Sequence, residues 1–211
     1  MSSTAVGNAL KAFAVATLFG AASIAHAGLV QVYYDGNDCA GVFTVGPGEC
    51  EVNGSPLIAK FDTVEGGGYT TTLGKYPSIT GSEFTIESTG QGTGTWSYNA
   101  GADDPAVNYW VAKGGPAFHL HYESSCSDGV FGSIADAEAA GCGLDTATSQ
   151  TSGAFYAPLN PNGNTHGGTK RYGLSHISFY NGGASVPEPA TLGMLGAGLF
   201  ALGLMRRRAV A

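Results

Sequence analysis

Glycine is the feature that most constrains how this chain folds. The chain has 34 glycines among 211 residues, well over twice the usual share of about 7%. Glycine supplies the positive φ angles that tight turns require, and the intervals between the glycines are rich in β-branched and aromatic residues. This pattern predicts many short strands and few helices.

Eight short runs in the sequence have the composition of strands and are separated by turn residues. Runs of this length are typical of an antiparallel two-sheet sandwich, either jelly-roll-like or immunoglobulin-like. Only residues 134–140 have a helical pattern, with Ser133 as a candidate N-cap. We therefore predict an all-β domain with strands at residues 29–34, 56–61, 83–87, 95–98, 107–113, 117–122, 154–156 and 174–180.

The clearest hairpin joins residues 107–113 to residues 117–122 through the sequence Gly-Gly-Pro. Successive side chains of a strand point to opposite faces, so the second strand has an apolar face and a polar face. We expect the apolar face to pack in the core and the polar face to meet solvent. The apolar face carries Phe118, Leu120 and Tyr122, and the polar face carries His119, His121 and Glu123.

Residues 1–27 have the three parts of a secretory signal peptide. Lys11 ends a weakly basic leader, residues 12–24 are apolar, and Ala25-His26-Ala27 has the small-x-small form that signal peptidase cuts. The apolar part is too short for a stop-transfer helix. We predict cleavage after Ala27 and an exported domain that extends from residue 28 to residue 185.

The C-terminal end, residues 186–211, has a stem, an apolar segment and a basic cluster. Pro187 and Pro189 flank Glu188 and fix an extended, accessible stem. Residues 191–205 are apolar and would form one transmembrane helix of roughly 22 Å, shorter than a hydrocarbon core of about 30 Å. The positive residues that follow hold the far end of such a helix in the cytoplasm, and they are Arg206, Arg207 and Arg208.

The order of Pro-Glu-Pro, short apolar helix and arginine cluster resembles the PEP-CTERM sorting signal. The resemblance implies recognition by an exosortase, in bacteria that secrete extracellular polysaccharide. It further implies an inner-membrane precursor and a final location in the cell envelope or on the extracellular surface. We interpret the short helix as a temporary membrane anchor that keeps the protein in place until the exosortase cuts it. The alternative is an ordinary membrane anchor that is never cut.

The charge of the exported span excludes some partners. It carries fifteen acidic residues against five basic ones, which gives a net charge of about −10. Such a surface repels phosphate backbones and anionic lipid headgroups, so we expect no nucleic-acid partner. The five basic residues are Lys60, Lys75, Lys113, Lys170 and Arg171.

Four cysteines lie in the exported span, and no pair of them has Cys-x-x-Cys spacing. In an oxidising compartment this arrangement favours two disulfides over a zinc or redox site. Of the three possible pairings we prefer the two local ones, Cys39 with Cys50 and Cys126 with Cys142, although pairing between the two loops stays open. Each local disulfide would pin a glycine-rich loop.

Two groups of residues have the side-chain types that bind metal ions. His119, His121 and Glu123 would point the same way on a strand, as in two-histidine, one-carboxylate sites, but the spacing departs from the cupin pattern. Asp35-Gly36-Asn37-Asp38 offers oxygen ligands for calcium, but Asx residues are also simply good turn formers, as in Asp103-Asp104. We favour a solvent-facing strand and turns, with no metal and no cofactor.

Nucleophile and nucleotide motifs are incomplete. Residues 173–176, Gly-Leu-Ser-His, begin like a nucleophile elbow but lack its last glycine and a following helix. Residues 90–94, Gly-Gln-Gly-Thr-Gly, lack the spacing of a dinucleotide-binding loop. We therefore predict no catalytic residues and no enzyme.

Two exported segments also resemble those of other PEP-CTERM proteins: Cys-x-Gly-x-Phe ahead of Asn-Gly-Ser-Pro, and a Tyr-Trp-Val-x-Lys strand ahead of Ser-His-Ile-Ser-Phe-Tyr. No activity is attached to that resemblance. The resembling segments are residues 39–43, 53–56, 109–113 and 175–180.

Four aromatic residues are candidates for sugar binding. Trp96, Tyr98, Tyr109 and Trp110 would bind sugar rings if exposed, but we expect them in the core.

The leading hypothesis is a non-catalytic protein of the envelope or extracellular matrix, processed by signal peptidase and an exosortase among extracellular polysaccharide. The first alternative is a carbohydrate- or calcium-binding surface module. The second is an extracellular hydrolase or metal-dependent enzyme, which requires His119, His121 and Glu123 to converge in a concave site.

Overall fold

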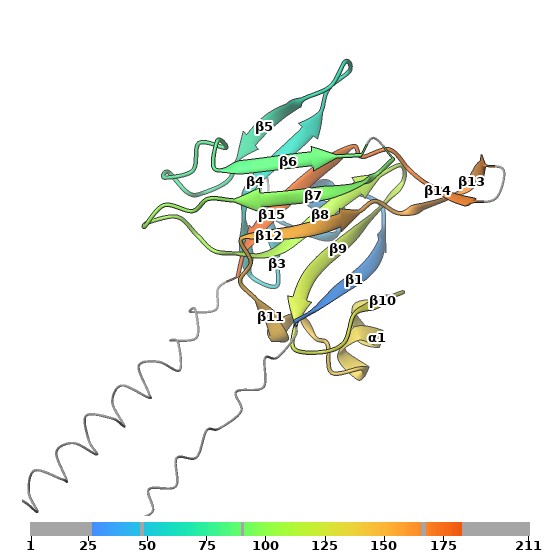
Figure 1. Cartoon of the computed structure of the whole chain (residues 1–211). Helices are drawn as coiled ribbons and strands as arrows, with labels where there is room; N and C mark the ends of the chain where they lie inside the picture. The colour runs from blue at the N-terminus through green and yellow to red at the C-terminus, as the bar shows by residue number, and fades with distance from the viewer. Residues whose placement is uncertain (1–26, 47–48, 90, 166–167, 183–211) are drawn as a thin grey trace, which may run out of the picture.

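The computed structural model describes residues 27–46, 49–89, 91–165 and 168–182 (Figure 1). The predicted signal peptide, apart from Ala27, and the predicted sorting signal lie outside the described residues. The short helical elements are η1 (Asp38–Val42, a π-helical turn), α1 (Ile134–Ala139) and η2 (Leu144–Thr146, a 3-10 turn). The strands are β1 (Gly28–Asp35), β2 (Thr44–Gly46), β3 (Glu49–Val52), β4 (Ser55–Thr63), β5 (Tyr69–Leu73), β6 (Phe84–Ser88), β7 (Thr93–Tyr98), β8 (Val107–Gly114), β9 (Ala117–Ser124), β10 (Gly129–Phe131), β11 (Ala147–Thr148), β12 (Ser152–Tyr156), β13 (Leu159–Thr165), β14 (Gly168–Arg171) and β15 (His176–Asn181).

A large sheet forms the centre of the described domain. Its order is β10-β1-β9-β8-β15-β4-β3-β2, with β11 beside β9 and β5 beside β4. The pairing is antiparallel except between β1 and β10, which run parallel. The predicted hairpin is β8–β9, and Gly115 at its turn has φ +61°, which a side chain rarely adopts.

A second sheet, β12-β7-β6, packs across one face of the central sheet (Figure 1). Aromatic rings join the two layers. Trp96 on β7 meets Trp110 on β8 with ring centres 5.1 Å apart, and Phe84 on β6 stacks on Phe179 of β15 at 4.5 Å. Such pairs add to the stabilisation from burial alone. This aromatic layer is one of the two cores of the domain.

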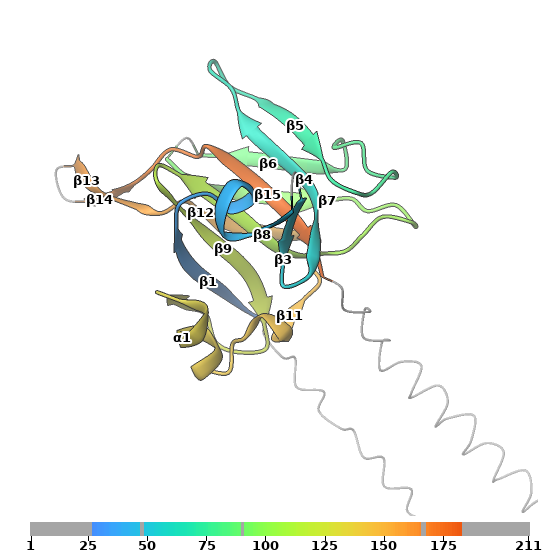
Figure 2. The same cartoon turned by 180° about the vertical axis from the view of Figure 1, so that it is seen from behind.

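The opposite face of the central sheet is covered by α1, η1 and the disulfide-linked loops (Figure 2). Ala137 of α1 packs against side chains of this face, which include Val32, Leu120 and Tyr122. Ser133 caps α1, because its side chain accepts a hydrogen bond from the Asp136 N–H at 3.2 Å. The middle of the central sheet is therefore buried on both faces.

The predicted all-β class with antiparallel sheets is confirmed, and each of the eight predicted strands overlaps a strand of the structure. The amphipathic hairpin is wrong in one respect. All eight residues of β8 are buried, and so are seven of the eight residues of β9. The second sheet covers the face of β9 that we expected to meet solvent. Its strands β7 and β12 come from other parts of the chain, so the sequence of the hairpin alone does not reveal this cover.

Candidate functional site

A buried polar cluster joins the turn after β1 to the last strand. Asp38 begins η1, and its carboxylate lies 3.0 Å from His176 Nε2 through both oxygens. Ser178 Oγ donates to Asp38 Oδ2 at 3.0 Å, and the Tyr180 hydroxyl donates to the same oxygen at 3.4 Å. His176, Ser178 and Tyr180 alternate along β15, so they share the face that meets η1. Each of the four residues is at most 5% exposed.

The cluster keeps the carboxylate of Asp38 ionised. Burial by itself would raise the pKa of Asp38, but the hydrogen bond and the charge of His176 act against it, as do the backbone N–H of Cys39 and the Ser178 hydroxyl. Together these lower the pKa of Asp38 to about 2. The far side of the imidazole, His176 Nδ1, lies 3.6 Å from Asp62 Oδ1. The buried carboxylate of Asp38 therefore has several hydrogen-bond donors around it.

The same residue types occur in hydrolase triads, but the geometry differs. In a triad the serine hydroxyl is hydrogen-bonded to the histidine, which accepts its proton. Here Ser178 donates to Asp38 instead, and Ser178 is fully buried. Ser175, the serine of the incomplete elbow motif, contributes backbone bonds to Thr63 and Lys113. The hydrogen bonds of the cluster connect η1 to β15 of the central sheet.

The cluster continues into the first disulfide. Cys39 is bonded to Cys50, and the Tyr180 hydroxyl lies 3.2 Å from the Sγ atoms of both. The second disulfide joins Cys126 to Cys142. Both pairs are the local ones preferred from the sequence.

His119 and His121 are buried beneath the second sheet, which corrects the expectation that they face solvent. They are 6% and 0% exposed. His121 Nε2 accepts the Tyr156 N–H at 3.2 Å, and His119 Nδ1 lies 2.9 Å from the Tyr156 carbonyl oxygen. Trp110 Nε1 donates to the Ala154 carbonyl at 2.8 Å. The edge strand β12 is thus fastened to β8 and β9 by side chains.

The surroundings of these histidines favour neutral imidazoles. Burial, together with a smaller effect of the nearby His119, lowers the pKa of His121 to about 3. Burial also lowers the pKa of His119. Glu123, the third residue of the considered metal set, pairs with Leu29 and Thr148 at the end of β9. Among the described residues, no group of three or more His, Cys, Asp or Glu side chains is placed to hold a metal ion.

In the candidate calcium loop, residues 35–38, the two aspartates point to different surroundings. Gly36 has φ +91° and donates its N–H to the Pro116 carbonyl at 2.8 Å, so the chain turns sharply after Asp35. Asp35 is exposed and accepts the Tyr33 hydroxyl at 2.7 Å, whereas Asp38 is turned inward to His176. In the second acidic turn, Asp104 accepts the Gly101 N–H at 2.7 Å. The two carboxylates of residues 35–38 therefore have different partners.

The aromatic residues considered for sugar binding are in the core, as expected. Trp96, Tyr98, Tyr109 and Trp110 are between 0% and 5% exposed. The Tyr98 hydroxyl donates to the Pro105 carbonyl at 2.9 Å, and the Tyr109 hydroxyl donates to the Leu144 carbonyl at 2.7 Å. The hydroxyls of the two tyrosines bind the chain's own backbone. All four rings are buried, so they are not available for stacking on a ligand.

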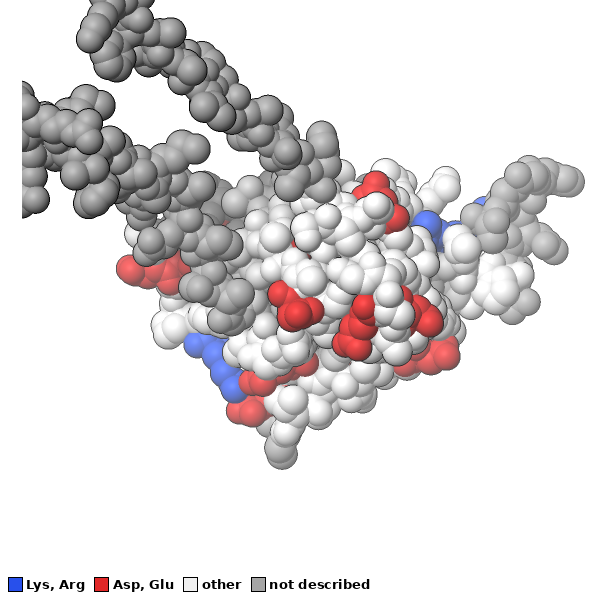
Figure 3. Space-filling view, turned by 90° about the horizontal axis from the view of Figure 1, so that it is seen from below, with Lys and Arg blue, Asp and Glu red and all other residues white. Residues whose placement is uncertain are grey.

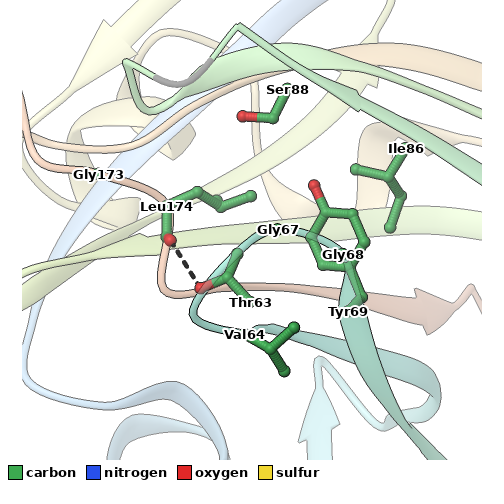
Figure 4. Close-up of a pocket in the computed structure, with 9 residues that line it drawn as sticks. All are labelled: Thr63, Val64, Gly67, Gly68, Tyr69, Ile86, Ser88, Gly173 and Leu174. Carbon is green, nitrogen blue, oxygen red and sulfur yellow. Dashed lines mark hydrogen bonds between the residues drawn. The ribbon is translucent and has the colours of Figure 1, made fainter.

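A pocket of about 550 Å³ opens between the β4–β5 turn, β6 and the segment before β15 (Figure 4). Among the described residues, none that lines this pocket is charged. The Thr63 hydroxyl donates to the Leu174 carbonyl at 3.0 Å across its floor. Its walls are Thr63, Val64, Gly67, Gly68, Tyr69, Ile86, Ser88, Gly173 and Leu174.

The model of the PEP-CTERM protein-sorting motif matches residues 185–208. The chain is a PEP-CTERM domain-containing protein. The motif implies export, a membrane-anchored precursor and sorting by an exosortase. No curated protein and no solved structure matches the chain significantly.

The matched motif lies at the C-terminal end of this PEP-CTERM protein. Pro187, Glu188, Pro189 and the arginines at 206–208 lie outside the described residues, as does the predicted helix 191–205. Within the described ranges, no helix is long and apolar enough to cross a membrane.

The face of the described domain that Figure 3 shows is mostly uncharged, and its charged side chains are mainly acidic. Figure 3 shows Asp and Glu side chains spread over the lower face, with Lys and Arg at its margins. The basic side chains are partly engaged: Lys60 pairs with Asp62 at 2.6 Å, and Lys113 Nζ donates to the Gly36 and Gly115 carbonyls. The face offers few cations to an anionic partner.

The sequence did not predict that Asp38 and His176 are partners. Asp38 lies in an acidic turn and His176 in the incomplete elbow motif, and 138 residues separate them. One signal was present: the resemblance to other PEP-CTERM proteins covers both the segment that begins at Cys39 and the strand 175–180. The structure brings these two segments together at the cluster.

Proposed function

We propose that the protein is a non-catalytic component of the cell envelope or extracellular matrix, cut by an exosortase near Pro187–Pro189 and then attached or released among extracellular polysaccharide. The observation that carries this proposal is the match of residues 185–208 to the sorting motif. Signal peptidase would act first, after Ala27, and the membrane would hold the precursor only until the second cut.

The burial and hydrogen bonding of three histidines support a non-catalytic role. Two residues of the enzyme hypothesis, His119 and His121, and the histidine of the incomplete elbow motif, His176, are each bound within the fold. Catalytic groups need access to a substrate, and these three are at most 6% exposed. They stabilise the domain instead.

The sorting step is tested by Glu188→Ala in the host. The signal peptide drives export, so translocation should continue, while the uncut precursor should accumulate in the inner membrane. Glu65→Ala is the matched control, because Glu65 is an exposed glutamate in the β4–β5 turn. Precursor accumulation in both variants, or in neither, would contradict the proposed role of Glu188.

The pocket beside Tyr69 favours a carbohydrate-binding module as the second candidate. An uncharged pocket with an aromatic wall suits a neutral sugar ring, because apolar sugar faces stack on aromatic rings. The test is retention of the exported protein on the host's extracellular polysaccharide, with and without calcium. Ile86→Ala should weaken retention if the pocket binds the polysaccharide, whereas Val130→Ala, an exposed apolar residue outside the pocket, should not.

A further inference from the structure

Strand β5 is an uncovered edge of the central sheet. It pairs with β4 from Ala59↔Leu73 to Thr63↔Tyr69 and lies outermost in both views (Figures 1 and 2). Its residues from Thr70 to Leu73 are exposed, and Leu73 is 44% exposed. In the part of the chain that the structure describes, no other strand pairs with β5.

The register shows which backbone groups are free. The Gly74 N–H donates to the Ile58 carbonyl at 2.8 Å, in line with the β4–β5 ladder. Because hydrogen-bonded and non-hydrogen-bonded pairs alternate in an antiparallel ladder, Thr70 and Thr72 bond to β4. Tyr69, Thr71 and Leu73 then direct their N–H and C=O groups away from it. Six backbone groups therefore point out from the edge.

The edge lacks the devices that usually prevent pairing. Exposed edge strands are commonly protected by lysine, proline, a bulge or an inward charge. The sequence of β5, Tyr-Thr-Thr-Thr-Leu, has no charge and no proline, and its register with β4 has no shift. Four of its five residues are β-branched or aromatic, which suits a paired strand.

We propose that β5 pairs with β5 of a second copy of this chain, antiparallel and with Thr71 on the two-fold axis. In this register Thr71 faces Thr71 of the second copy, and Tyr69 faces Leu73 in both directions. Each of these is a hydrogen-bonded pair, so all six outward groups of each copy find partners. The central sheets of the two copies become continuous, and an aromatic–aliphatic pair forms on each side of the axis.

A second copy fits this edge better than an unrelated partner for three reasons. The strand sequence is self-complementary about Thr71, as an isologous two-fold contact requires. Two copies that each carry a net charge of about −10 can meet at this edge without placing like charges in the contact, because β5 has no charged residue. The start of β1 and the end of β15 lie on the opposite side of the described domain from β5, so a second copy at this edge does not meet either of them (Figure 1).

The test is sedimentation equilibrium of the full chain in detergent, with charge variants at the axis. Thr71→Lys and Thr71→Glu each place two like charges face to face, and we expect each to weaken self-association at least tenfold. An equimolar mixture of the two variants should recover a dimer, because the charges then attract. Thr70→Lys is the control: it adds the same charge to the same strand, but its side chain lies on the other face, opposite Asp62.

The mixture also shows whether the variants fold, since a recovered dimer requires two intact edges. Added salt should strengthen the wild-type dimer, because it screens the repulsion between two acidic domains. A wild-type chain that is monomeric at all concentrations would overturn the proposal. So would association that Thr71→Lys and Thr71→Glu weaken no more than Thr70→Lys does, or variants with wild-type circular dichroism whose mixture stays monomeric.

Discussion

The two faces of the central sheet bury histidine in different ways. On the face toward η1, His176 is paired with a carboxylate, and the hydroxyls of Ser178 and Tyr180 complete the shell around that carboxylate. On the face toward the second sheet, His121 accepts a hydrogen bond from the backbone N–H of Tyr156 and stacks on Trp110. One face therefore holds a charge that has partners, and the other holds an imidazole that the fold keeps neutral. The partner, more than the depth of burial, decides which form is stable.

The difference gives the two faces separate responses to acid. The pKa of Asp38 is about 2 in the fold, below its ordinary value of 3.8, so its contribution is complete above pH 3.8 and is lost as the pH falls toward 2. The pKa of His121 is about 3 in the fold, below its ordinary value of 6.5. Between these values the unfolded chain takes up a proton that the native chain excludes, so stability already falls as the pH drops below 6.5.

The largest expected effect comes from breaking the charged cluster. Asp38→Ala leaves His176, Ser178 and Tyr180 without their shared acceptor, and we expect a loss of about 4 kcal/mol in the free energy of unfolding. Urea unfolding of the exported protein measures it. Asp35→Ala is the control, because Asp35 is an exposed aspartate three residues away, and its change should stay within about 0.5 kcal/mol. Equal losses would mean that the cluster does not hold η1 on the sheet.

The neutral face is tested by His121→Ala. The variant leaves the Tyr156 N–H unpaired and opens a cavity beside Trp110, so we expect a loss of about 2 kcal/mol. Glu123→Ala, a change two residues later on the same face of β9, should cost about 0.5 kcal/mol or less. A loss of only a few tenths of a kcal/mol for His121→Ala would restore the solvent-facing interpretation that the sequence suggested.

The smallest expected effect is a change in how stability depends on pH when His121 is replaced. Between pH 6.5 and pH 3, each histidine that stays neutral in the fold makes stability fall by up to about 1.4 kcal/mol per pH unit. His121→Gln removes one such group, so its stability should depend less steeply on pH than that of the wild type. Urea midpoints at pH 7 and pH 5 give the answer. A His121→Gln variant as pH-dependent as the wild type would mean that His121 is protonated in the native state.

Local sequence predicted the local features of this fold. Runs of β-branched and aromatic residues between turns predicted eight of the strands. Ser133 predicted the start of α1, and the short spacing within each cysteine pair predicted the disulfides. The strand β5 was missed, because a run of threonines beside a glycine-rich turn is also typical of a loop.

The burial of His119 and His121 was beyond such reasoning for a physical reason. Alternation along β9 shows that the strand has two faces, but it does not show whether a second layer covers the polar one. That layer comes from β7 and β12, which are distant in sequence from one another. The pairing of Asp38 with His176 has the same origin, because long-range contacts depend on how the sheet is ordered.

The measurement that tests the central claim most directly is the intact mass of the wild-type protein recovered from envelope and extracellular fractions of the host. A PEP-CTERM protein processed as proposed should begin at Gly28 and end near Pro187–Pro189, without the apolar segment and the arginines. Recovery mainly with residues 191–211 still attached would contradict the account, because the C-terminal segment would then be a permanent anchor and not a sorting signal.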